Sequence, residues 1–297
     1  MKPADFEYVR PSSVLEAVEA LAASPDDAKI LAGGQSLVPM MNFRLATPAL
    51  LVDINRIPEL DVVEARDGGI VIGAATRQAD VEASALVLQH CPLLAEGLGH
   101  VGHPQLRTRG TVVGSLVHAD PAAETPAVAL ALGARVTVSG PGGARTIAAA
   151  DFFETYFTTD VAPDEVATEV WFPSAPEGSG SAFVEIARRP GDFAMVGVAA
   201  TLQVADGNIV TAAVAVSGMA DRPVRLGGVE AALEGARSDV ATFAAVAPTA
   251  ADEEGLRPSD DVHATGAYRR TVLPVLVEQA LTTAARRAAG TGERNGR

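Results

Sequence analysis

Cysteine is almost absent from this chain of 297 residues, which contains only Cys91. A single thiol forms no intrachain disulfide, and the common iron–sulfur clusters need four thiolate ligands. The chain alone therefore cannot build such a cluster or any other cysteine-rich metal centre. Cys91 precedes Pro92 in an apolar setting, and this predicts a buried thiol.

Basic charge and long apolar runs are also scarce. The chain has 23 Lys and Arg against 37 Asp and Glu, a formal net charge of −14 at pH 7, whereas nucleic-acid-binding domains usually carry a basic face. No window reaches the roughly 18 unbroken apolar residues that suggest a membrane span. Residues 1–6 lack the apolar core of a signal peptide. We expect a soluble cytoplasmic protein.

The commonest nucleotide-binding and hydrolase motifs are missing. The sequence contains neither Gly-x-Gly-x-x-Gly after a strand nor Gly-x-x-x-x-Gly-Lys-Ser/Thr. Ser36 lacks the second glycine of a nucleophile elbow. The glycine-rich stretch 140–143 lies between strand-like runs and predicts a hairpin turn. His100 and His103 could in principle bind a metal, but no third ligand is close in sequence, so a structural or solvent-facing role is favoured.

The length and the 48% apolar content favour two domains, each with its own core. The clearest linker is the stretch 174–180, which is rich in Gly, Pro and Ser. The predicted division is a first domain at 1–175 with subdomains at about 1–57 and 58–175, a C-terminal domain at 178–288, and a disordered tail at 289–297.

The first part of the chain has an α/β pattern. Ser13 and Glu16 have the spacing of a capping box, and apolar residues at helical intervals predict a helix to about Ala23. Short apolar runs predict strands at about 29–31 and 50–54. The segment between them, 39–45, is expected to be a connection.

From about residue 60 the pattern changes to hairpins and helices. A hairpin is predicted around the turn at 67–69, and Pro92 divides a mostly helical stretch at 78–98. Further expected elements are a helix at 126–132, a strand at 134–139, a hairpin turn at 141–143, a short helix opening at Asp151, and an edge strand at 165–172 that ends at Pro173.

The C-terminal part reads as a small antiparallel sheet packed on a helix bundle, an α+β arrangement. The expected strands are 182–187, 194–204 and 209–216, followed by helices at 228–233, 239–247 and 267–288, the last with Pro274 inside it.

The least ordinary stretch is 29–39, where a short apolar run ends in Gly33, Gly34, Gln35 and Ser36. Such a strand delivers backbone N–H groups into a tight turn, and glycines let the turn close around a bulky anion such as a phosphate. An isolated Gly-Gly pair is also common as a simple turn that ends a strand. A second loop is needed to choose between these interpretations.

A second stretch, 109–126, again combines glycines with small hydroxyl side chains. It adds Asp120 and Glu124, whose ionised carboxylates only accept hydrogen bonds and therefore suit sugar hydroxyls. Two such loops in one domain could hold the two ends of a dinucleotide.

Together the two loops resemble those of the FAD-binding medium subunits of molybdenum hydroxylases, a family that includes the carbon monoxide dehydrogenase and xanthine dehydrogenase flavoprotein subunits. The first loop of this resemblance is 32–39 with 52–55, and the second is 105–115 with 118–124. Similar short motifs at 151–153, 188–194 and 267–270 extend the resemblance over nearly the whole chain. The chain departs from the family at Val113, where glycine is usual, and at Glu124, where aspartate is common.

The resemblance implies an α+β fold: a two-part FAD-binding domain of the vanillyl-alcohol-oxidase (PCMH) type, followed by a C-terminal antiparallel sheet with a helix bundle. It implies that backbone N–H groups of 32–36 face the pyrophosphate and that Asp120 and Glu124 accept hydrogen bonds from ribityl or ribose hydroxyls. Phe193 would contact the flavin ring, unless it is a plain core residue. Arg188 and Arg189 would either stabilise reduced flavin or be surface charges.

The full set of cofactor-binding residues that the resemblance implies is Lys29, Leu31, Ala32, Gly33, Gly34, Gln35, Ser36, Leu37, Val101, Gly102, Thr111, Gly114, Ser115, His118, Asp120, Glu124, Asp192 and Phe193. No catalytic residue and no metal ligand is expected in this chain.

The implied function is that of an FAD-carrying electron-transfer subunit. A large partner would hold the molybdenum cofactor and a small partner the [2Fe-2S] clusters, in a dimer of heterotrimers. The flavin would pass electrons to an external acceptor, and the resemblance fixes neither the substrate nor this acceptor. The alternatives are a self-sufficient flavoprotein oxidase of the same fold and a non-catalytic interaction protein whose glycine turns are only structural.

Overall fold

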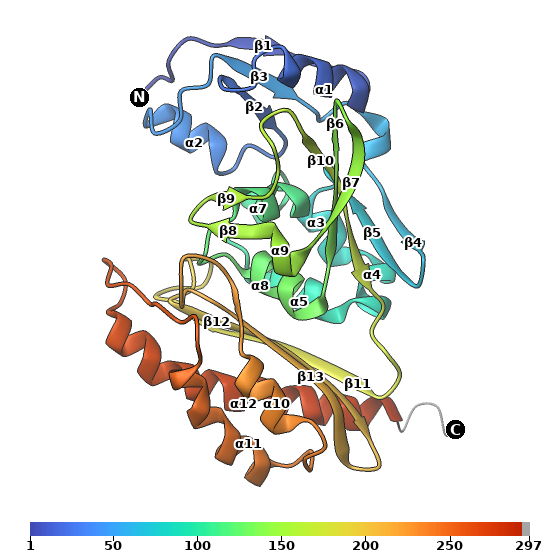
Figure 1. Cartoon of the computed structure of the whole chain (residues 1–297), viewed down its shortest axis with the longest axis vertical. Helices are drawn as coiled ribbons and strands as arrows, with labels where there is room; N and C mark the ends of the chain where they lie inside the picture. Colours follow the sequence, from blue (N-terminus) through green and yellow to red (C-terminus); the bar gives the residue numbers. More distant parts are fainter. Residues whose placement is uncertain (293–297) are drawn as a thin grey trace.

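The computed structural model describes residues 1–292. Figure 1 shows the chain as three tiers along its longest axis, each built around one sheet. The N-terminal tier holds a three-stranded sheet, the middle tier a five-stranded sheet with most of the short helices, and the C-terminal tier a four-stranded sheet backed by the last helices. The site described below lies where these tiers meet.

The N-terminal sheet is parallel, with the strand order β1-β3-β2. Ser13 caps the first helix by accepting a hydrogen bond from the Glu16 N–H at 3.2 Å, but the Glu16 carboxylate returns its bond to the N–H of Ser12, one residue earlier than expected. The elements of this tier are β1 (Glu7–Val9), α1 (Val14–Ala22), β2 (Ala28–Leu31), α2 (Leu37–Asn42) and β3 (Leu50–Asp53).

Two of these elements, β1 and α2, are not predicted from the sequence. Strand β1 is only three residues long and exists because β3 offers a free edge. Helix α2 occupies part of the segment that was expected to be a connection. Its Pro39 is compatible with a helix because it stands in the first turn, where the backbone N–H has no intrahelical acceptor anyway.

The middle tier is an antiparallel sheet with the order β4-β5-β10-β6-β7. The two predicted hairpins are confirmed as β4–β5 and β6–β7. The strands of this tier are β4 (Val63–Arg66), β5 (Gly69–Gly73), β6 (Arg135–Gly140), β7 (Gly143–Ala148) and β10 (Val166–Pro173), with a separate two-stranded ribbon of β8 (Phe153–Thr155) and β9 (Thr158–Thr159).

The prediction that the stretch 165–172 is an edge strand is wrong. Strand β10 is the central strand, because β5 pairs along one side of it and β6 along the other. Proline is tolerated because Pro173 is the last paired residue, opposite Gly69. A terminal proline is typical of an edge strand, whereas the side chains of Val166, Val170 and Phe172 are buried, as a central strand requires.

Short helices cover this sheet. The stretch that Pro92 was expected to divide in two forms three helices, because the chain also turns at Ser84, which ends α3 and caps α4. The stretch 109–126 is not a loop throughout, since it contains α7 and the start of α8. The helices are η1 (Pro58–Leu60), α3 (Gln78–Ala83), α4 (Ala85–His90), α5 (Pro92–His100), α6 (Pro104–Arg107), α7 (Val112–His118), α8 (Glu124–Leu132) and α9 (Ala149–Phe152).

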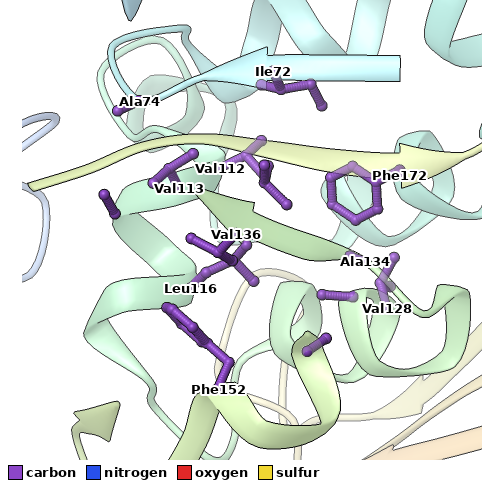
Figure 2. Packing of buried hydrophobic residues seen from close by; sticks show 14 of the residues in the cluster. Ile72, Ala74, Val112, Val113, Leu116, Val128, Ala134, Val136, Phe152 and Phe172 are labelled. Atoms are coloured by element: carbon purple, nitrogen blue, oxygen red, sulfur yellow. The ribbon is translucent and has the colours of Figure 1, made fainter. Parts of the chain in front are cut away.

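Helix α7 is anchored in the main core. Figure 2 shows Val112, Val113 and Leu116 packed among side chains of the five-stranded sheet, including Val136 and Phe172. Val113 is 2% exposed and lies in the first turn of the helix. It therefore needs no positive φ, and its methyl groups bury apolar surface that a glycine would not.

The C-terminal tier is an antiparallel sheet with the order β11-β12-β13-β14, covered on one face by the long helix α12 and on the other by α5 and α8 (Figure 1). Side chains alternate along its strands, apart from an irregularity at Gln203 and Val204, so that Phe183, Ala199 and Ala215 join the core of the middle tier while their neighbours pack on the C-terminal helices. The elements are β11 (Ser179–Ile186), β12 (Val196–Ala205), β13 (Asn208–Ser217), β14 (Val224–Arg225), α10 (Gly227–Leu233), α11 (Val240–Val246), η2 (Ala247–Asp252) and α12 (Gly266–Gly292).

Helix α12 runs four residues into the segment 289–297 that was predicted to be disordered. The rest of that segment, 293–297, lies outside the described residues. Pro274 lies inside the helix as expected. Cys91 is buried as expected, and burial raises the pKa of its thiol to about 12.

Replacing Phe172 with alanine tests the central position of β10. The side chain is fully buried, and truncation of a buried phenylalanine costs about 3–5 kcal/mol in the free energy of unfolding. Denaturant unfolding of the full chain measures this loss. The matched control is Phe43→Ala, at a side chain that is 64% exposed, for which we expect a change below about 1 kcal/mol. Equal effects of the two variants would contradict the assignment.

Candidate functional site

The two glycine stretches lie in direct contact. A Cβ atom on Gly33 would stand 2.3 Å from the carbonyl oxygen of Arg109 and 2.7 Å from the Cα atom of Gly110, so the two backbones touch where only glycine fits. A Cβ atom on Gly114 would lie 3.8 Å from the Cβ of Ala32. The bend after β2 and the first turn of α7 therefore face each other across a narrow seam.

Two side chains fasten this seam. Asn55 follows β3, and its amide nitrogen donates to the carbonyl oxygens of Leu31 at 3.2 Å and Ala32 at 2.9 Å. Arg77 donates from Nη2 to the Asn55 side-chain oxygen at 2.6 Å and from Nη1 to the carbonyl oxygen of Arg109 at 2.9 Å. One guanidinium thus links the first bend to the second. Because guanidinium groups present their donors in a fixed fork, this link also sets the relative orientation of the bends.

Asp53 holds Asn55 in place through hydrogen bonds. Its Oδ1 accepts hydrogen bonds from the Asn55 backbone N–H at 2.9 Å and side-chain amide at 2.6 Å, and its Oδ2 accepts one from the Tyr8 hydroxyl. Burial works against ionisation of Asp53, but these hydrogen bonds outweigh it and lower the pKa of the carboxyl below its usual value. The support is therefore a carboxylate at neutral pH.

The first bend presents backbone donors without acceptors. Within residues 1–292 the N–H groups of Gly34, Gln35 and Ser36 have no hydrogen-bond acceptor. They precede α2, and Gly34 adopts a positive φ of 72°. Successive free N–H groups in such a bend form a concave anion-binding surface. The Gln35 side chain folds back to donate to the Gly33 carbonyl oxygen at 3.0 Å, which stiffens the bend.

The first turn of α7 contributes from the opposite side of the seam. Thr111 is its N-cap, and its hydroxyl accepts a hydrogen bond from the Gly114 N–H at 3.1 Å. The Ser115 hydroxyl lies 2.6 Å from the Thr125 hydroxyl in the first turn of α8. This contact continues the line of polar groups from the seam to Glu124.

Glu124 is the first residue of α8 and is only 4% exposed. Its side chain forms no hydrogen bond with another side chain in the described part of the chain. Burial is the main cause that raises the pKa of its carboxyl to about 7, and the nearby charges of Glu185 and Asp120 act in the same direction. The group therefore changes charge near neutral pH.

The segment after α5 forms the far end of this line. Gly102 has a positive φ of 51°, and the Arg107 guanidinium donates to the carbonyl oxygen of Val101 at 3.0 Å. Arg107 is 9% exposed and is itself held by Glu82 at 2.7 Å. A Cβ on Gly191 would lie 2.7 Å from the His103 ring, so the loop after β11 packs directly on this segment.

That loop carries an exposed aromatic ring. Phe193 is 56% exposed, so the alternative that it is a plain core residue is wrong. Next to it, Arg188, Arg189, Asp192 and His263 line a shallow hollow of about 310 Å³. Both arginines are exposed.

The remaining predicted residues lie along or beside this line. Lys29 is exposed on β2, Leu31 ends that strand, and Leu37 starts α2. The His118 ring lies 5.2 Å from that of Phe157, and burial lowers the pKa of His118. Asp120 Oδ1 accepts a hydrogen bond from the Ala122 N–H at 2.9 Å, so this carboxylate shapes its own turn.

Three residues that hold the site together were not predicted. Asn55 and Arg107 stand within the motifs that carry the family resemblance, but those motifs indicate no role for either, and the sequence does not single out Arg77. A sequence signal exists only for Asn55, which follows a strand on the carboxyl side of a parallel sheet, where polar residues often serve a site. Nothing in the pattern around Arg77 indicates that it bridges two loops.

Other classes of site lack support within residues 1–292. There is no group of three or more His, Cys, Asp or Glu side chains that could hold a metal ion. The Nδ1 atom of His100 instead faces the Glu185 carboxylate at 3.1 Å. In the same part of the chain, no helix has the length and apolar character that crossing a membrane requires.

Comparison with protein families assigns both parts of the chain. Residues 4–175 match the model described as the FAD binding domain in molybdopterin dehydrogenase. Residues 181–284 match the model described as the CO dehydrogenase flavoprotein C-terminal domain.

Comparison with individual proteins supports the same family assignment. The chain is 42% identical over 294 residues to the 6-hydroxypseudooxynicotine dehydrogenase complex subunit alpha of Paenarthrobacter nicotinovorans. The alignment covers 99% of this chain and 99% of that protein. It superposes with a TM-score of 0.93 and 36% identity on a carbon monoxide dehydrogenase chain from Hydrogenophaga pseudoflava, covering 97% of this chain and 99% of that one. It also superposes on a quinoline 2-oxidoreductase chain from Pseudomonas putida 86 with a TM-score of 0.92 and 35% identity. This match covers 97% of this chain and 99% of that one.

Glu124 makes the stability of the cofactor-free chain depend on pH. Because folding raises the pKa of this carboxyl to about 7, the folded protein holds the proton more tightly than the unfolded chain. The resulting stability is present at low pH and is lost as the pH rises from about 4.5 to 7, by up to about 3 kcal/mol. Glu124→Gln should therefore stabilise the chain at pH 8 relative to the wild type, and less so at pH 5.

Urea unfolding of the wild type and the variant at pH 5, 6, 7 and 8 measures this difference. The control is Glu254→Gln, which removes an exposed carboxylate and should leave the pH profile unchanged. A Glu124→Gln profile parallel to that of the wild type would show that Glu124 does not titrate in this way.

Proposed function

Because the chain belongs to the family of FAD-binding subunits of molybdopterin dehydrogenases, we propose that it works as the electron-transfer subunit of a molybdenum hydroxylase. In this role it takes electrons from iron–sulfur clusters of a small partner and passes them to an external acceptor. A large partner with the molybdenum cofactor oxidises the substrate. The single cysteine supports this division of labour, since the clusters must come from another chain.

The observation that carries the proposal is the seam at Gly33. Its missing side chain leaves backbone N–H groups of Gly34, Gln35 and Ser36 available on one side and the first turn of α7 on the other. A diphosphate suits this surface, because several amides together supply enough partial positive charge without a lysine or arginine. The residues present therefore fit the phosphate part of FAD.

The middle of the line fits a polyol. Ser115 and Thr125 offer hydroxyl groups, and within residues 1–292 the carboxyl of Glu124 bonds its own backbone but no other side chain. A carboxyl can accept hydrogen bonds from ribityl hydroxyls, and glutamate reaches one methylene further than aspartate from the same helix position. Asp120 keeps one oxygen for its own turn and has the other for a ligand.

The far end fits a flat ring. Val101 and Gly102 present backbone that Arg107 holds in place, and the exposed Phe193 offers an aromatic face from the C-terminal domain. When bound, the isoalloxazine supplies the redox chemistry, since it accepts and releases one or two electrons. The chain's own part is to orient the ring and limit its contact with water, with Arg188 and Arg189 as the nearest cationic groups on the loop that carries Phe193.

The same proposal covers the organisation of the assembly. The chain would act as two domains, 1–175 with subdomains at about 1–57 and 58–175, and 178–288. It would work in the cytoplasm in a dimer of heterotrimers with the large and small subunits. The 18 residues named in the sequence analysis, from Lys29 to Phe193, are the proposed cofactor contacts.

Purification with and without partners tests the function. Co-expressed with its large and small partner subunits, the chain should purify as a complex that contains FAD, iron and molybdenum. Substrate should bleach the flavin absorbance only in that complex, while chemical reductant bleaches it in the isolated chain as well. Bleaching of the isolated chain by an organic substrate would favour a self-sufficient oxidase, and absence of FAD from both preparations would refute the proposal.

Arg77→Met should weaken FAD binding without unfolding the chain. The variant loses the two charge-assisted hydrogen bonds that join the bends, and a loss of about 1.5–3 kcal/mol raises the Kd for FAD about ten- to hundredfold. FAD fluorescence during titration of the FAD-depleted chain measures the Kd. The matched control is Arg56→Met, at an exposed arginine beside Asn55, where the Kd should stay within about twofold of the wild type. Unchanged FAD affinity in Arg77→Met would show that the hydrogen bonds of Arg77 between the two bends are not needed for FAD binding.

A further inference from the structure

Three ionisable side chains meet where the middle tier packs on the C-terminal sheet. His100 ends α5, Glu124 begins α8, and Glu185 belongs to β11 (Figure 1 shows the three elements). The Nδ1 atom of His100 lies 3.1 Å from Oε1 of Glu185. The Glu185 side chain is 7% exposed and that of His100 is 38% exposed. The group therefore combines two buried acids with one base that reaches solvent.

Buried polar atoms at this junction lack partners. Within residues 1–292, Oε2 of Glu185 and the Ser217 hydroxyl are buried and form no hydrogen bond. Glu185 pairs with Gly197 and Gly197 pairs with Ser217, so the three stand in one row across the sheet, on the face toward α5 and α8. A buried carboxylate oxygen without a donor is costly. The junction is thus short of hydrogen-bond donors and of positive charge.

The surrounding charges reinforce this shortage. His100 faces Glu185 on β11, Glu124 on α8 and Glu96 on its own helix, while Glu124 also faces Asp120 in the turn before α8. Of these acids, Glu96 is the one with an arginine partner within residues 1–292, through bonds of 2.6 and 3.0 Å from Arg287 of α12. The hydrogen bond with Glu185 raises the pKa of His100, and burial raises that of Glu124. Both shifts favour holding a proton.

The position of the cluster connects it to the proposed cofactor. Glu124 adjoins Thr125, whose hydroxyl contacts Ser115 of α7, and His100 immediately precedes Val101 and Gly102. The cluster therefore lies beside the line of polar groups that runs from the glycine seam to the ring segment.

We propose that His100, Glu124 and Glu185 form a proton-binding junction that couples retention of FAD to protonation, so that binding of FAD draws one proton from solvent into this cluster. The inference rests on the proposed function. FAD brings a doubly charged diphosphate and covers the groove, and both effects raise the cost of unneutralised carboxylates nearby. The proton enters through the half-exposed imidazole and is shared between His100 and Glu124. FAD affinity consequently falls as the pH rises.

Titration of the FAD-depleted full chain with FAD, followed by flavin fluorescence from pH 6.5 to 8.5, tests the inference. We expect the Kd of the wild type to rise at least about tenfold and at most about hundredfold over these two pH units, because uptake of one proton changes an equilibrium constant by at most about tenfold per pH unit. Calorimetry of the same titration in buffers of different ionisation enthalpy, which needs no variant, should show proton uptake at pH 7.5.

The double variant His100→Lys, Glu124→Gln keeps a positive charge beside Glu185 but removes both titrating groups. Its Kd should change by less than about twofold over the same pH range, whatever its absolute value. The matched control is Glu64→Gln, which breaks an ion pair with Arg66 within β4, outside the cluster, and should keep the slope of the wild type. Circular dichroism of each variant shows that it is folded.

A merely structural role for the cluster would weaken binding equally at every pH. A pH-independent wild-type Kd, no buffer dependence of the binding enthalpy, or a slope in the double variant equal to that of the wild type would each overturn the inference while leaving FAD binding intact. Failure of the wild type to bind FAD at any pH would instead refute the proposed function, and the inference with it.

Discussion

The site depends on one guanidinium. Arg77 joins the side chain of Asn55, which fixes the bend after β2, to the carbonyl oxygen of Arg109, which precedes α7. The N-terminal sheet and the five-stranded sheet are separate, so nothing in either sheet alone sets the distance between the two bends. With this tie in place, the bends can approach until a side chain at position 33 has no room. The anion-binding surface is thus a property of the packing between two sheets.

The two ends of the candidate site differ in rigidity. Backbone N–H groups at the start of α2 and α7 need no side-chain rotamer to be ordered, and α7 is fixed by the buried Val112, Val113 and Leu116 (Figure 2). The other end of the site is softer. Phe193 stands in an exposed loop, and the junction around Glu185 and Glu124 holds unpaired polar atoms that an ideal core would avoid. If the proposed contacts are correct, FAD would be held rigidly at its phosphates and more loosely around its ring.

Much of this could be predicted from the sequence. Glycine content and turn chemistry identified both bends, period-two alternation identified the hairpins β4–β5 and β6–β7, and the family resemblance supplied the fold and the cofactor. Features that arise from tertiary contacts could not be predicted. The three-residue strand β1 exists only through β3, β10 is central although it ends in a proline, and Arg77 acquires its role from two partners at distant positions in the chain. Local propensity carries no information about such partners.

Hydrogen–deuterium exchange of the full chain, with and without FAD, tests the central claim that two bends bind one diphosphate. If the account is correct, the amides at 34–36 and at 112–113 become protected together on addition of FAD, at the same FAD concentration. Protection of only one of these segments, or of neither while FAD remains bound, would contradict it.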